Sequence, residues 1–280
     1  MADDVVVTDD PTIAVADEAP APEVVGEADA APTEPVADEN PDPDWLSREQ
    51  AEANIRARLR QVQPDPDDPD GKPYGHNWYE VETQRSRAAA RSIGVDEETF
   101  LAAVAATSPG TPWDTKSGKR PNLAAVLALA KAVEDHPDAM PDEVVAWCKL
   151  DAMPGEKPQG YNKNLEKAVR ILYGEDPKRV LGNIKTGHFF ANLLHPERHA
   201  NDPTIDRWAI RIMLGMPGSN KRGYYQHDKE SSWFGTPKGY AWAMDRYRTV
   251  ASEIGISAMA AQGATWVNIR EEAGQPWIRK

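Results

Sequence analysis

The sequence predicts an all-α fold, and three observations support this prediction. From Trp78 onward, apolar residues recur three or four positions apart in successive segments, which is the period of an amphipathic helix. Proline, glycine and aspartate separate these segments. No run of alternating apolar and polar residues, the pattern of a half-buried strand, occurs between residue 78 and the C-terminus. The 280 residues suffice for one well-buried domain or two small ones.

Residues 1–45 predict a disordered acidic tail. They are rich in alanine and proline, hold 14 of the 45 acidic residues and no lysine or arginine, and contain no aromatic residue before Trp45. Such a segment buries too little apolar area to offset the entropy lost on ordering. The tail also accounts for the net charge of −13, because the remaining residues carry 31 acids and 32 bases. An acidic chain of this kind does not exclude a nucleic-acid partner.

Residues 46–77 predict a short helix, capped by Ser47, and an irregular linker, and residues 78–280 predict a helical domain. Within the domain, Asp96 is the expected N-cap of one helix. Pro121 occupies the first turn of the next, where proline is tolerated.

Further helices are predicted along the rest of the domain. Residues 164–174 place one apolar stripe on a helix that Gly174 ends. Residues 239–255 carry a longer stripe, and a last short helix holds Ala264 and Val267.

The compartment expected from the sequence is a reducing cytoplasm. The chain starts without the basic and apolar regions of a signal peptide, and no segment approaches the roughly 18 apolar residues of a membrane span. The single Cys148 excludes an internal disulfide and a four-cysteine iron–sulfur or zinc site. His188, His195 and His199 lie close together in sequence without matching acidic or cysteine ligands, so we expect neither a metal site nor a cofactor.

An aspartate in the stretch DPTIDRWAIRI, residues 202–212, has two interpretations. The apolar residues around it recur with helical spacing, which puts Asp206 in the first turn of a helix and Trp208 on its buried face. A carboxylate there can simply complement the helix dipole. It can also be the acid of a reaction.

Residues 160–214 predict a helix, a turn with the sequence LGNIKTG, a second helix with the sequence KTGHFFANLL, a loop, and the helix that opens at Asp206. Two helices joined by a tight glycine-containing turn form a helix-hairpin-helix. Its exposed backbone N–H groups can hold a DNA phosphate without reading the base sequence.

This pattern resembles the helix-hairpin-helix base-excision DNA glycosylase superfamily of the endonuclease III type, and most of all its divergent members from actinobacterial phages. Tyr161 and Asn162 match the start of the helix before the hairpin, LGNIKTG matches the hairpin, and IDRWAIRI matches the aspartate motif. The resemblance covers residues 78–215. It implies that Lys185 occupies the position of the nucleophilic lysine and Asp206 that of the catalytic aspartate, in a protein that acts in a phage-infected bacterial host.

The resemblance also implies contacts with DNA. The residues expected to bind DNA are Gly182, Asn183, Ile184, Thr186, Lys163 and Arg207. A base that leaves the stack needs an aromatic side chain to hold it or to fill the gap, and Trp113 and Tyr161 are the candidates.

Cleavage of an N-glycosidic bond builds positive charge on the sugar, which a carboxylate stabilises. An attacking lysine must be neutral, so its pKa must be lowered. We therefore expect a DNA-binding protein of the glycosylase superfamily that acts on a damaged or modified base through Asp206, with Lys185 as a possible nucleophile. The alternatives are a non-catalytic DNA-binding module of the same fold and an enzyme of phage thymine hypermodification.

Overall fold

The computed structural model confirms the all-α prediction, because its described residues contain helices and no β-strand. The structure describes residues 42–109, 111–115, 118–151, 158, 160–182, 184–219 and 232–279, which all belong to one compact unit, Asn40–Lys280. Residues 1–41 of the expected tail lie outside this description. None of the described helices is long and apolar enough to cross a membrane.

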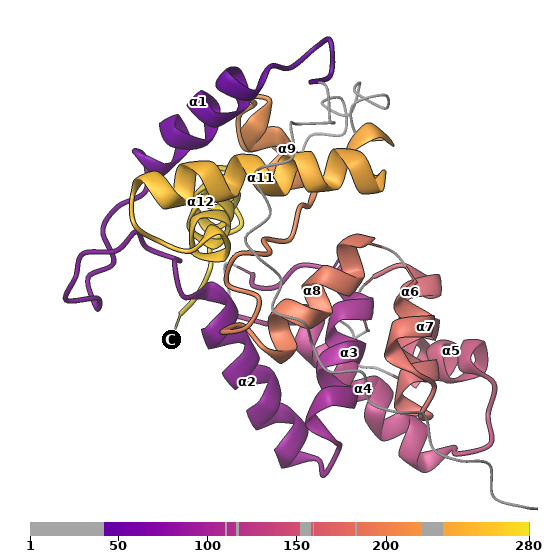
Figure 1. Ribbon diagram of the computed structural model, residues 1–280. Coiled ribbons are helices and arrows are strands. Elements are labelled where there is room, and N and C mark those ends of the chain that lie inside the picture. The colour runs from indigo at the N-terminus through magenta and orange to yellow at the C-terminus, as the bar shows by residue number, and fades with distance from the viewer. Residues whose placement is uncertain are drawn as a thin grey trace, which may run out of the picture. The chain divides into compact units, whose positions relative to one another are not determined.

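One group of helices surrounds α3 in the lower half of Figure 1. Every residue of α3 from Phe100 to Thr107 is buried, since α2, α4, α6, α7 and α8 all pack against this helix. The members of this first group are α2 (Trp78–Ser92), α3 (Glu97–Thr107), α4 (Pro121–Asp135), α5 (Pro141–Asp151), α6 (Asn162–Leu172), α7 (Pro177–Leu181) and α8 (Ile184–Leu194).

A second group of helices lies in the upper half of Figure 1. Its members are α1 (Arg48–Leu59), α9 (Arg207–Met213), α11 (Pro237–Glu253) and α12 (Ala258–Glu272). Helix α1 packs against the other three, so the short helix expected before the domain is part of the packed unit. The unit also starts earlier than the expected tail boundary at residue 45, because the Asp42 carboxylate accepts a hydrogen bond from the Trp242 indole at 3.1 Å.

The helix starts follow the local chemistry of the sequence. The Ser47 hydroxyl accepts a hydrogen bond from the Gln50 N–H at 3.2 Å, and the Asp96 carboxylate accepts one from the Thr99 N–H at 2.9 Å. Pro121 is the first residue of α4, as predicted. The last helix, α12, has 15 residues and is longer than expected. It is buried on almost all sides, so its sequence has no clear apolar stripe from which its full length could be predicted.

The region of the predicted hairpin differs from the expectation. A short helix, α7, lies between α6 and α8, with Pro177 in its first turn and Gly182 at its end in the left-handed conformation, φ 58°. Helix α8 begins at Ile184, so only Gly182 and Asn183 remain for the turn, and Asn183 lies outside the described residues. Lys185 is therefore the second residue of α8, one position further into the second helix than expected.

The two groups of helices meet where α12 crosses the start of α2. A Cβ atom on Gly263 would lie 2.9 Å from the Gly75 carbonyl oxygen, and one on Gly75 would lie 2.8 Å from the Val267 side chain. Both positions therefore need glycine for this close approach, and Gly75 also has a positive φ of 87°. The approach brings side chains of α2 and α12 to one cavity.

The C-terminal segment after α12 returns to the first group. The Trp277 indole N–H donates to the Glu82 carboxylate at 2.8 Å, and the Arg279 guanidinium contacts both oxygens of the buried Asp65 carboxylate. The Ile278 N–H donates to Asp114. These contacts place buried carboxylates under the end of the chain.

Candidate active site

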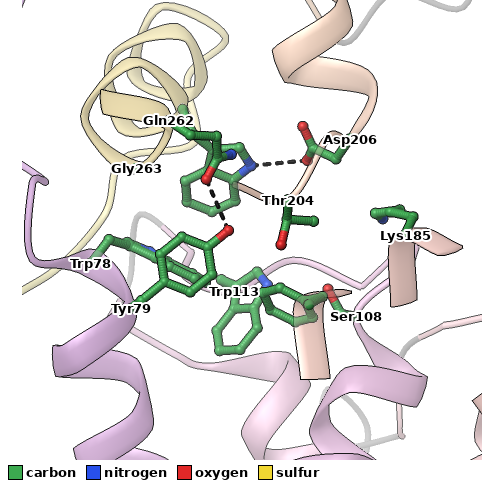
Figure 2. A pocket seen from close by; sticks show the side chains of 11 residues that line it. Trp78, Tyr79, Ser108, Trp113, Lys185, Thr204, Asp206, Gln262 and Gly263 are labelled. Carbon is green, nitrogen blue, oxygen red and sulfur yellow. Dashed lines mark hydrogen bonds between the residues drawn. The ribbon is translucent and has the colours of Figure 1, made fainter. Parts of the chain in front are cut away.

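Asp206 is the N-cap of α9, one position before the expected first turn. Its Oδ1 accepts hydrogen bonds from the Trp208 and Ala209 N–H groups, both at 2.9 Å. Its Oδ2 accepts a hydrogen bond from the Trp266 indole N–H at 3.1 Å, drawn as a dashed line in Figure 2. The carboxylate thus starts a helix and is also fixed in direction at the wall of a cavity.

Trp266 is itself held by its neighbours, so the direction of its indole N–H is set by packing. Its ring lies 4.9 Å from the Trp78 ring, centroid to centroid, and the Arg270 guanidinium lies 4.2 Å from its centroid. The contact between Trp266 and Asp206 joins α12 to α9.

Lys185 points from the first turn of α8 into the same cavity (Figure 2). The side chain is half-buried and, within the described part of the chain, its amine has no hydrogen-bond or ion-pair partner. Burial lowers the pKa of Lys185, although the nearby Asp206 carboxylate acts in the opposite direction. The amine is therefore neutral more often than that of an exposed lysine.

The cavity has a narrow inner part and a wide outer part. The inner part has a volume of about 30 Å³, room for about two water molecules, and the outer cleft has about 400 Å³. The residues common to both walls are Ser108, Trp113, Lys185, Asp206 and Trp266. Lys185 and Asp206 thus lie at the junction, where they face both spaces.

The outer cleft has more positive than negative charge. Lys185, Arg207 and Arg270 contribute to its wall together with one carboxylate, Asp206. Arg207 is exposed, and its guanidinium lies 5.0 Å from the centroid of the Trp208 ring. This arrangement suits an anionic ligand such as a phosphodiester.

The residues expected to bind DNA are not all equally accessible. Gly182, Lys163 and Arg207 are exposed, and Ile184 is half-buried at the start of α8. Thr186 is buried, so its side chain does not reach the surface and only the start of α8 is left for a contact there. Lys163 lines neither the inner cavity nor the outer cleft.

The aromatic candidates occupy different environments. Trp113 is buried, with its ring 5.0 Å from that of Trp78 and 5.8 Å from that of Phe189, so it is part of the cavity wall and is not free to insert into DNA. Tyr161 is 67% exposed at the rim of the outer cleft. Trp208 packs in the core, as its position on the apolar stripe predicted.

The three histidines considered for a metal site have other neighbours. His188 stacks on the Tyr240 ring at 5.0 Å, His195 lies 3.7 Å from a Glu197 carboxylate oxygen, and His199 lies 3.2 Å from an Asp202 carboxylate oxygen. In the described ranges, no three His, Cys, Asp or Glu side chains gather where they could hold a metal ion.

Sequence reasoning missed four residues that complete the cavity, three of which come from helices distant in sequence. Tyr79 comes from α2, Thr204 from the loop before α9, and Gln262 and Trp266 from α12. The one signal in the sequence is the presence of polar residues, such as Gln262, between the small apolar residues of α12.

The comparisons with known proteins give a family but no relative of known activity. No curated protein matches the chain, and no solved structure does. Residues 46–273 match a family of unknown function, DUF7178, and this match covers most of the chain. The protein therefore belongs to the DUF7178 family.

Proposed function

We propose that this protein binds DNA and cleaves the N-glycosidic bond of a damaged or modified base. The observation that carries the proposal is the meeting of Lys185 and Asp206 at one cavity, to which they come from different groups of helices. Both side chains line the inner cavity and the outer cleft, so they face a space that a substrate can enter.

The geometry before Lys185 supports the DNA-binding part of the proposal. Gly182, at the end of α7, is exposed and left-handed, and α8 begins at Ile184. The N–H groups at the start of a helix hold phosphate oxygens in a helix-hairpin-helix. A phosphate bound there would place the DNA backbone beside Lys185.

The chemistry follows from the two side chains. Asp206 stabilises the positive charge that develops on the deoxyribose when the bond to the base breaks, because both of its oxygens are held in place beforehand. Lys185, when neutral, attacks C1′ of the sugar while the nucleobase leaves with the bonding electrons. The proton that the lysine nitrogen then loses passes to a nearby acceptor such as the Asp206 carboxylate.

A second candidate function has one observation in its favour. The N-cap bonds of Asp206 give this residue a structural purpose without any reaction. A DNA-binding module that has no catalytic activity would keep the aspartate for this reason alone.

An excision assay separates the two candidates. Duplex and single-stranded oligonucleotides that carry damaged and phage-type modified thymines are incubated with the wild type and with Asp206→Asn. Asparagine is as good an N-cap as aspartate, so α9 is retained. The matched control is Asp96→Asn, which changes an exposed N-cap aspartate far from the cavity.

Abasic product from the wild type and from Asp96→Asn, but not from Asp206→Asn, is the result we expect. Equal DNA binding by all three proteins with no product from any of them would contradict the catalytic proposal and favour the non-catalytic module. Altered bases without strand loss would instead indicate base modification.

A further inference from the structure

The inner cavity ends in a polar pair that the reaction at the sugar does not use. The Tyr79 hydroxyl donates a hydrogen bond to Gln262 Oε1 at 2.8 Å, as Figure 2 shows. Both side chains are almost fully buried, with 2% and 3% of their surface exposed. Because the amide oxygen accepts from the tyrosine, the amide nitrogen, Nε2, remains as a hydrogen-bond donor.

One donor at this end of the cavity lacks a partner. Within the described part of the chain, Gln262 Nε2 donates no hydrogen bond. Gln262 lines the inner cavity, so this amide group remains for a ligand or a water molecule that accepts hydrogen bonds.

The size of the cavity limits what part of a ligand can enter. The inner volume of about 30 Å³ holds about two water molecules and not a whole base. The outer cleft of about 400 Å³ has room for a ring, and the two spaces share the wall that contains Lys185 and Asp206. A base in the cleft would therefore insert one edge and leave its sugar near these two side chains.

We propose that Gln262 recognises the hydrogen-bonding edge of the target base and that Tyr79 fixes the orientation of its amide. This inference rests on the proposed function and names its substrate class: bases with a free imide or amidine edge, in which a donor lies next to an acceptor. Gln262 Nε2 donates to the acceptor on the base, and Gln262 Oε1 uses its second lone pair for the neighbouring N–H. A base alkylated at that edge is excluded, so any modification that the protein recognises lies on another side of the ring.

Binding to defined oligonucleotides tests the inference without requiring excision. The probes are dye-labelled single strands with one central deoxyuridine, N3-methyldeoxyuridine or 2,4-difluorobenzene deoxynucleotide. The last probe has the shape of uracil without its hydrogen bonds. Single strands avoid the energy needed to unpair the base. Fluorescence anisotropy is measured with the Asp206→Asn protein, so that the strands stay intact.

We expect deoxyuridine to bind about tenfold more tightly than either analogue, as the loss of one or two hydrogen bonds predicts. Gln262→Met, which keeps the size of the side chain but removes the amide, should abolish this preference. Tyr79→Phe should reduce it, because the amide is then free to turn. Gln63→Met is the matched control at an exposed position and should keep the full preference. Circular dichroism shows whether each variant is folded.

Equal affinity for the three probes, or a preference that survives in both cavity variants, would overturn the inference. The outcome is separable from that of the proposed function. A preference for deoxyuridine in a protein that excises no base would contradict only the proposed function. Excision without any preference would contradict only the recognition of the base edge by Gln262.

Discussion

Replacing Asp206 tests how firmly the structure holds this carboxylate. Asp206→Ala removes the acceptor of two N–H groups of α9, which costs about 1 kcal/mol for an N-cap. It also leaves the buried Trp266 indole N–H without its acceptor, which costs about 1–3 kcal/mol. The free energy of unfolding should therefore fall by about 2–4 kcal/mol, and the melting temperature by roughly 5–15 °C for a unit of this size.

Comparison with asparagine separates the two contributions. Asp206→Asn keeps the cap but offers Trp266 no second oxygen, so it should lose only the indole contribution of about 1–3 kcal/mol. The control pair is Asp96→Ala and Asp96→Asn, because Asp96 caps α3 at an exposed position. There alanine should cost about 1 kcal/mol and asparagine almost nothing.

Urea unfolding followed by circular dichroism measures the free energy of unfolding of these variants. Equal stability losses for Asp206→Asn and Asp96→Asn would refute the hydrogen bond between Trp266 and Asp206 as a fixed feature of the site.

Three further predictions concern packing, the lysine and the buried carboxylates. Gly263→Ala should lower the free energy of unfolding by about 1–3 kcal/mol, because its Cβ would lie 2.9 Å from a backbone carbonyl oxygen. Gly187→Ala, whose Cβ would have no atom within 4 Å, should raise the free energy of unfolding by about 0.5–1 kcal/mol. Thermal unfolding measures both, and equal effects would contradict the close packing of α12 on α2. Borohydride trapping on abasic DNA should yield a covalent adduct that Lys185→Met abolishes and Lys178→Met keeps. The adduct should form at a lower pH than an exposed lysine requires, because the pKa of Lys185 is lowered. An unchanged adduct yield in Lys185→Met would contradict the nucleophilic role of Lys185. Burial raises the pKa of Glu82, so its contribution to stability is present at low pH and is lost as the pH rises through that pKa. Urea unfolding between about pH 4 and pH 8 should show the wild type losing stability relative to Glu82→Gln as the pH increases. A stability difference that does not change with pH would contradict the raised pKa.

Local sequence signals predicted the parts of the fold that depend on neighbouring residues. Ser47, Asp96 and Pro121 mark helix starts by their own side chains, and these starts are where the sequence places them. Helix α7 was not predicted, because it has five residues and too few apolar positions to show a period. Helix α12 was predicted too short because its small and polar residues are buried on most sides, so no stripe is visible.

In the candidate site, too, a local motif predicted some residues and not others. Lys185 and Asp206 follow from a motif within one stretch of chain, and the structure places both at one cavity. Tyr79, Gln262 and Trp266 come from helices far away in sequence, and only the approach of α12 to α2 brings them there. Their role depends on tertiary packing, which no local pattern encodes.

One binding measurement tests most directly whether Asp206 acts on the sugar, and it needs no knowledge of the target base. Single-stranded oligonucleotides carry either a cationic pyrrolidine analogue of the abasic sugar or the neutral tetrahydrofuran analogue. The wild type should bind the cationic strand at least about tenfold more tightly than the neutral one, since a held carboxylate faces the charge. Asp206→Asn should lose this preference and Asp96→Asn should keep it. An undiminished preference in Asp206→Asn would contradict a catalytic role for Asp206.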